Sequence, residues 1–97
     1  MVEFEWNPAK ASANVRKHRV SFLEAATVFC DPLAITIFDP EHSHDEDRYI
    51  TIGVSPSGRV LMAAHTDRGG RVRIITAREL TRKEREAYED EIQKRNG

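Results

Sequence analysis

The fold is decided by residues 50–79, which read ITIGVSPSGRVLMAAHTDRGGRVRIITARE. Apolar residues alternate with other residues in three runs of this stretch, at 50–54, 60–64 and 72–74. A period of two is typical of a β-strand. The segments 55–58 (SPSG) and 67–70 (DRGG) separate the runs and are short enough to close hairpins. The stretch therefore predicts three consecutive antiparallel strands.

A fourth strand is expected before this stretch, where Leu33, Ile35 and Ile37 alternate in the same way. The acidic segment 39–47 would connect it to the strand that begins near residue 49. Together the four segments predict a mainly antiparallel meander.

Three helices are predicted from their capping residues. Asn7-Pro8 places a capping side chain before a proline at the first helical position, which predicts a helix to about His18. Ser21 and Glu24 have the spacing of a capping box, and the helix they open should end at Asp31-Pro32. A second such box, Thr81 with Glu84, opens a helix to about Arg95.

These elements predict one α+β domain over residues 1–97, with two N-terminal helices, a four-stranded mainly antiparallel sheet and a C-terminal helix. The piece from Val2 to Trp6 should be extended. With helices on one sheet face, we expect the other face to carry the polar and functional side chains. These are Tyr49, Thr51, His65, Arg71 and Arg73.

The net charge of −1 conceals an uneven distribution. Fifteen Lys and Arg stand against sixteen Asp and Glu in 97 residues, a balance that excludes indiscriminate binding of polyanions by the whole surface. Residues 31–47 hold six of the acidic residues and no Lys or Arg, which leaves the remainder with an excess of five positive charges. We expect the acidic stretch and a basic set (Arg48, Arg71, Arg73 and Arg78) to lie on different surfaces.

The residue types point to a protein of the cytoplasm with no membrane association. The single cysteine, Cys30, cannot form an internal disulfide, and the sequence has no apolar run of transmembrane length and no signal pattern. The segment Glu41-His42-Ser43-His44-Asp45 contains metal-ligand types but has no evident distant partner, so a solvated polar loop is favoured over a metal site. No metal or cofactor is expected.

Several motifs resemble those of one known family. They are Phe4-Glu5-Trp6-Asn7-Pro8-x-Lys10, Asn14-x-x-Lys17-His18, Val20-Ser21-Phe22-x-Glu24-Ala25, Val28-Phe29-x-Asp31-Pro32, Glu46-Asp47-Arg48, Arg73-Ile74-Ile75-Thr76-Ala77-Arg78 and Glu84-x-x-x-Tyr88. In this order they resemble the BrnT toxins of type II toxin–antitoxin modules. One departure is Arg19, since the family usually has glycine after Lys-His. A side chain at a left-handed helix terminus costs about 1 kcal/mol.

The resemblance implies a RelE-like fold and a toxin that stops translation by cleaving RNA, on ribosome-associated mRNA or on free RNA. It also implies neutralisation by a BrnA-type, ribbon-helix-helix DNA-binding antitoxin, through which alone the module would contact operator DNA.

Metal-free cleavage of RNA needs proton transfer and stabilisation of the phosphate charge. We assign charge stabilisation to Arg48 and Arg78, because guanidinium groups suit phosphate oxygens. Tyr88 is the candidate for orienting the nucleophile or moving a proton, and the alternative is a core anchor. The candidates for RNA binding are Lys10, Lys17, His18, Arg71 and Arg73. The competing interpretation is a non-catalytic module that binds nucleic acid or protein, such as a degenerate toxin acting as corepressor.

Overall fold

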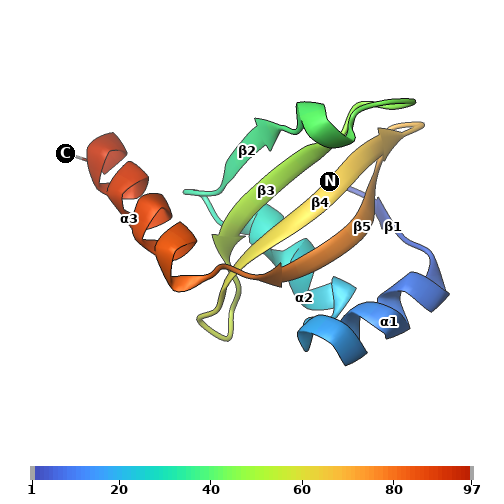
Figure 1. Ribbon diagram of the computed structural model, residues 1–97, viewed down its shortest axis with the longest axis horizontal. Coiled ribbons are helices and arrows are strands. Elements are labelled where there is room, and N and C mark those ends of the chain that lie inside the picture. Colours follow the sequence, from blue (N-terminus) through green and yellow to red (C-terminus); the bar gives the residue numbers. More distant parts are fainter. Residues whose placement is uncertain (1, 97) are drawn as a thin grey trace.

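The computed structural model describes residues 2–96 as a curved sheet with helices behind it and a helix beside it (Figure 1). In chain order the elements are β1 (Phe4–Glu5), α1 (Pro8–His18), α2 (Phe22–Thr27), the short 3-10 turn η1 (Val28–Cys30), β2 (Ile35–Phe38), the short 3-10 turn η2 (Pro40–His42), β3 (Tyr49–Val54), β4 (Val60–Arg68), β5 (Arg71–Glu79) and α3 (Arg82–Asn96).

The predicted capping residues Asn7 and Ser21 make capping hydrogen bonds at the starts of α1 and α2. The Asn7 side chain accepts hydrogen bonds from the backbone N–H groups of Ala9 and Lys10 at the start of α1. Ser21 accepts from the Glu24 N–H at the start of α2. These bonds satisfy donors that a helix leaves without partners in its first turn.

The sheet has five strands in the order β1-β5-β4-β3-β2 and is mixed. β1 pairs with β5 in parallel, through Phe4 with Val72 and Glu5 with Arg73, and the remaining pairs are antiparallel. The prediction of a four-stranded, mainly antiparallel sheet is therefore wrong. The missed strand has two residues, too few to show a period, and its partner is far away in the sequence.

The core lies between the sheet and the N-terminal helices. Phe22, Ala25 and Val28 pack on Leu61 and Ala63 of β4, and further residues of this cluster are Val20, Ile74 and Ala77. Gly53 of β3 pairs with Leu61, so it lies on the same, helix-covered face of the sheet. Gly53 has no room for a side chain there, because an added Cβ would lie 2.9 Å from the Val28 carbonyl oxygen.

Tyr49, Thr51 and His65 also lie on this helix-covered face, so their expected position on the opposite face is wrong. Thr51 is 1% exposed and His65 is 5% exposed. Thr51 Oγ1 lies 2.8 Å from His65 Nε2, and the His65 ring contacts Phe29 of η1 edge-on at 4.9 Å. Both faces carry apolar residues on alternate positions, so the period alone does not tell which face is buried.

The opposite face, here called the open face, is apolar at its centre and is turned toward the viewer in Figure 1. Its cross-strand rows follow from the pairing: Ile35 beside Ile52 beside Met62, and Ile37 beside Ile50 beside Ala64. Ile37 remains 49% exposed. Arg78 and Thr76 continue these two rows on β5.

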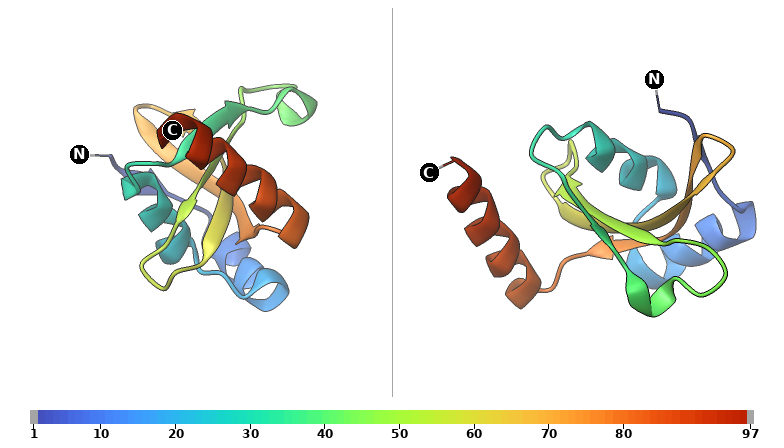
Figure 2. Two further views of the ribbon diagram at one scale, coloured as in Figure 1. Left: turned by 90° about the vertical axis from the view of Figure 1, so that its left-hand side faces the viewer. Right: turned by 90° about the horizontal axis from the view of Figure 1, so that it is seen from above.

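Helix α3 stands beside the sheet rather than on the core (Figure 2). Tyr88 is its one buried residue among Arg82–Arg95, and Ile92 is half-buried. The other side chains of residues 82–95 are exposed, and most of them are charged. Its position therefore depends on few contacts. Within residues 2–96, no helix is long and apolar enough to cross a membrane.

Candidate functional site

A hollow between α1 and β5 brings together three of the predicted RNA-binding residues. Lys10, Lys17 and His18 line it with Ile75 and Thr76, and its volume is about 190 Å³. Positions 17 and 18 follow position 10 by seven and eight residues, which is about two turns of helix, so the three side chains lie on one face of α1. Two cationic side chains and an imidazole thus surround a surface that would suit a phosphate group.

Asn14 holds the two walls of this hollow together. Its amide nitrogen donates to the carbonyl oxygens of Val20 at 2.9 Å and Ala77 at 2.8 Å. Its oxygen accepts from Thr76 Oγ1 at 3.0 Å and from the Ala77 N–H at 3.2 Å. A buried amide with four bonds fixes α1 against β5 and so fixes the spacing of the basic residues.

The Arg78 side chain lies on the open face, as Thr76 does, and it is hydrogen-bonded to Glu84 of α3. The guanidinium meets the carboxylate with two bonds, of 2.8 and 3.0 Å. The hydrogen bond from Arg78, and after it the hydrogen bond from the backbone N–H of Thr81, lower the pKa of Glu84 to about 2. The same bond raises the pKa of Arg78. In this structure Arg78 therefore joins β5 to the first turn of α3.

Arg71 and Arg73 are also matched by carboxylates. Arg71 Nε lies 3.1 Å from Glu3, and Arg73 Nη1 lies 2.8 Å from Glu5 on the neighbouring strand β1. A phosphate at either position would have to compete with a glutamate. The missed strand β1 thus changes the electrostatics of β5.

Arg48 lies at the other end of the sheet, in the loop between β2 and β3. Its Nη2 is 3.7 Å from Glu46, which also lies 3.5 Å from Arg68. The expected separation of the acidic stretch from the arginines is therefore wrong for Arg48, because this loop turns back on its own last residue. Arg48 Nε is buried without a hydrogen-bond partner among residues 2–96.

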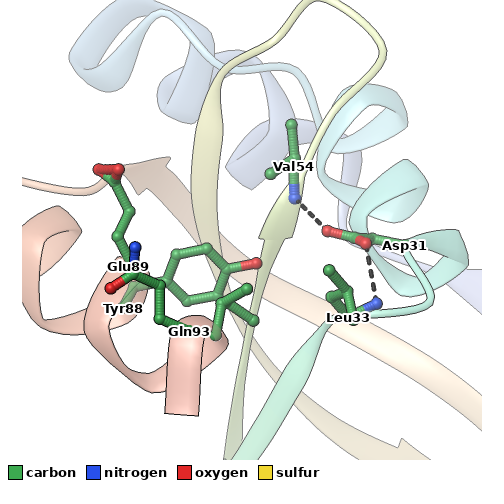
Figure 3. A pocket seen from close by; sticks show the side chains of 7 residues that line it. Asp31, Leu33, Val54, Tyr88, Glu89 and Gln93 are labelled. Atoms are coloured by element: carbon green, nitrogen blue, oxygen red, sulfur yellow. Dashed lines mark hydrogen bonds between the residues drawn. The ribbon is translucent and has the colours of Figure 1, made fainter. Parts of the chain in front are cut away.

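Tyr88 occupies a third place, between α3 and the segment before β2 (Figure 3). Its ring extends toward Asp31 in a hollow of about 330 Å³ that Leu33 and Val54 also line. Asp31 is held by the N–H groups of Leu33 at 2.9 Å and Val54 at 2.8 Å. Burial, and then the charge of Asp31, raise the pKa of Tyr88. This direction is opposite to the one that a proton acceptor needs.

A protein-family model describes ribonuclease toxins, BrnT, of type II toxin–antitoxin systems, and it matches residues 6–84 of this chain. The chain belongs to the BrnT family. The matched segment begins before α1 and ends in the first turn of α3, so among the predicted site residues only Tyr88 lies beyond it.

One solved structure similar to this BrnT-family chain is the crystal structure of the Brucella abortus ribonuclease toxin BrnT. The TM-score is 0.62, the sequence identity is 15%, and the match covers 84% of this chain and 100% of that chain. At this identity the likeness concerns the fold. No curated protein sequence matches the chain.

The predicted site residues of this BrnT-family chain thus lie in four separate places. Lys10, Lys17 and His18 meet at the hollow beside β5, and Arg48 lies in the β2–β3 loop. Tyr88 extends from α3 toward Asp31. Arg71 and Arg73 lie at the start of β5 and Arg78 near its end.

Sequence reasoning missed a polar pocket around Arg48. His42, His44, Asp45 and Glu46 line it together with Arg48, and its volume is about 210 Å³. The pattern of two histidines two residues apart, followed by an arginine, is visible in the sequence. The sequence favours a solvated polar loop for this segment over a metal site, and neither interpretation predicts a pocket shared with Arg48.

Proposed function

We propose that this BrnT-family chain cleaves RNA without a metal ion and thereby stops translation. The observation that carries the proposal, beside the family, is the gathering of Lys10, Lys17 and His18 in one hollow held rigid by Asn14. Arg78 and Arg48, toward opposite ends of the sheet, supply positive charge to separate phosphates of the RNA.

In this proposal the RNA backbone lies along α1 and β5. Lys10, Lys17 and His18 bind one phosphate, while Arg71, Arg73 and Arg78 offer further contacts on β5. A phosphate presents the same paired oxygens as the Glu84 carboxylate, so RNA would exchange with Glu84 at Arg78. Tyr88 is buried against Asp31, and burial raises its pKa, so in this proposal it anchors α3 instead of acting on the nucleophile.

The partner we propose is a BrnA-type antitoxin with a ribbon-helix-helix DNA-binding region, through which the pair would reach operator DNA. We place the module in the cytoplasm, where the lone Cys30 stays reduced.

RNA binding at the hollow is tested with the double variant Lys10→Ala/Lys17→Ala. Its dissociation constant for a fluorescent single-stranded RNA should rise about tenfold, and the slope of log affinity against log salt should shrink by about 0.7, because the two lysines share one phosphate contact. The matched control is Lys83→Ala/Lys94→Ala, which removes two exposed lysines of α3. Equal affinity and slope in both double variants would place the RNA elsewhere.

Cleavage is tested by incubating the wild-type chain with RNA and with translating ribosomes, in EDTA and in magnesium. Products that form equally in EDTA and in magnesium with free RNA support the metal-free nuclease. Cleavage that requires magnesium in the absence of ribosomes contradicts metal independence. Tight binding without any cleavage, also on ribosomes, supports the non-catalytic module instead.

A further inference from the structure

The loop from Asp39 to Arg48 is closed by its own hydrogen bonds. The Asp39 N–H donates to the Arg48 carbonyl oxygen at 2.8 Å, and the Arg48 N–H donates to Ser43 Oγ at 2.9 Å. Ser43 Oγ in turn donates to the Asp39 carbonyl oxygen. From β4, Thr66 Oγ1 donates to the Asp47 carbonyl oxygen at 2.6 Å. These bonds hold an exposed polar loop in one conformation.

Within this loop, Asp39 orients His42. His42 Nδ1 lies 2.8 Å from Asp39 Oδ2, and the Asp39 side chain is only 15% exposed while that of His42 is 66% exposed. A carboxylate that accepts the Nδ1 proton fixes the tautomer and leaves Nε2 to exchange a proton with another molecule. The pair has the arrangement of an acid–base catalyst in contact with solvent.

The pocket beside this imidazole suits an anion. His42, His44 and Arg48 line it, and the buried Arg48 Nε is a donor without a partner among the described residues. Two carboxylates also line it. Glu46 lies between Arg48 and Arg68, whereas Asp45 takes part in none of the ion pairs of residues 2–96.

We propose that this loop pocket is where the RNA phosphodiester reacts, with His42 and His44 as the proton-transfer pair and Arg48 as the phosphate ligand. The inference rests on the proposed ribonuclease function and names the reacting groups. RNA bound along β5 reaches the loop past Arg68, which is paired with Arg71 in the β4–β5 register and with Glu46 of the loop.

The step is an internal transfer that needs no further reactant. His42 Nε2 takes the proton of the ribose 2′-OH, and the 2′-oxygen bonds to phosphorus while the bond from phosphorus to the 5′-oxygen breaks. The leaving 5′-oxygen takes a proton from the His44 imidazolium. Arg48 donates to the non-bridging oxygens, where charge increases in the transition state. The products are a 2′,3′-cyclic phosphate and a 5′-hydroxyl, and water returns the imidazoles to their starting protonation.

Cleavage by three variants tests the proton-transfer pair. His42→Asn and His44→Asn should each lower kcat for RNA cleavage at least 100-fold, with an affinity for RNA within about twofold of the wild-type value, because the α1–β5 hollow is untouched. Asp39→Asn should lower kcat by about 10-fold or more with little change in KM, since it acts through the orientation of His42. The control is Glu41→Gln, an exposed neighbour in the same loop, which should cleave at the wild-type rate.

Binding of a 3′-nucleotide tests the phosphate pocket independently of RNA cleavage. The imidazole carbon-bound proton resonances of His42 and His44 should shift when a 3′-nucleotide is titrated into the full chain, while those of the buried His65 should not. Arg48→Ala should weaken this binding about tenfold, and Asp45→Asn should strengthen it a few-fold by removing the unmatched carboxylate.

The outcomes are distinct. If the wild-type chain cleaves RNA and the histidine variants cleave equally well, the inference is overturned and the ribonuclease function stands. If the wild-type chain cleaves no RNA, free or on ribosomes, the proposed function fails and the cleavage step fails with it. Absence of any shift at His42 and His44 rules out the phosphate pocket.

Discussion

Glu24 fastens α2 to the turn between β3 and β4, and neutralising it should weaken the fold in a pH-dependent way. Its carboxylate accepts from the Ser55 and Ser57 hydroxyls at 2.7 Å each and pairs with the Arg59 guanidinium. The hydrogen bond from Arg59 is the main reason that the pKa of Glu24 falls from its ordinary 4.5 to about 2. The Glu24 side chain is 21% exposed, so the contacts are partly shielded from solvent.

The size of the effect follows from this pKa. A difference of about 2.5 pKa units corresponds to about 3 kcal/mol between the charged and neutral forms, and partial exposure to water should reduce it to about 2 kcal/mol. Glu24→Gln keeps the shape and removes the charge. At pH 7 it should therefore lower the free energy of unfolding by about 2 kcal/mol. With a urea m value of about 1 kcal/mol/M, the midpoint should fall by about 2 M.

The sign of the pH dependence is fixed by the lowered pKa. The wild-type advantage is complete above the unfolded-state pKa near 4.5 and disappears as the pH falls toward 2, because the carboxylate then takes up a proton. Urea unfolding of wild type and Glu24→Gln at pH 7, 5, 4 and 3 should show the gap narrowing below pH 5. Glu91→Gln, on the exposed surface of α3, should change neither midpoint nor pH profile. A gap of equal size at pH 7 and pH 3 would refute the reasoning.

Two further substitutions test α1, one at its contact with the sheet and one at its C-terminal end. Asn14→Ala removes the side chain that bonds to Val20 and Ala77 and should lower the free energy of unfolding by about 3 kcal/mol. Calorimetry should then show a thermal midpoint lower by about 12 °C or more. A fall of less than about 4 °C would show that the bonds are not needed. Arg19 has φ 59° and ψ 31° at the end of α1, in the left-handed region that glycine adopts freely. Arg19→Gly should therefore raise the stability by about 0.5–1 kcal/mol, since the N–H bond to Val15 is kept, and a lower thermal midpoint would contradict this.

Local signals in the sequence were sufficient for the helix starts, because a cap is a contact between near neighbours. Asn7 reaches only to Lys10, and Thr81 and Glu84 bond each other's backbone N–H groups within one turn. The strand β1 has no such signal. Its two residues pair with Val72 and Arg73 across most of the chain, so only the folded structure brings them together.

The candidate site was less predictable because it depends on distances between strands and on the partners of each charge. Residue types suggested that Arg78 and Arg48 would meet one phosphate, yet they lie toward opposite ends of the sheet. Arg78 pairs in register with Met62, whereas Arg48 precedes Tyr49, which pairs with His65. The clustering of Lys10 and Lys17 on one face of α1 is a consequence of helical spacing and could be read from the sequence alone.

The open face has a thermodynamic consequence for the folded chain. Its isoleucines and Met62 stay partly in water after folding, so unfolding exposes less new apolar surface than the length of 97 residues implies. Both the heat capacity of unfolding and the urea m value scale with that newly exposed surface, and both should be smaller than for a sheet covered on two sides. Any molecule that covers this face only in the folded state will raise the melting temperature by mass action. The melting temperature of the chain alone is therefore a lower bound on its melting temperature in such a complex.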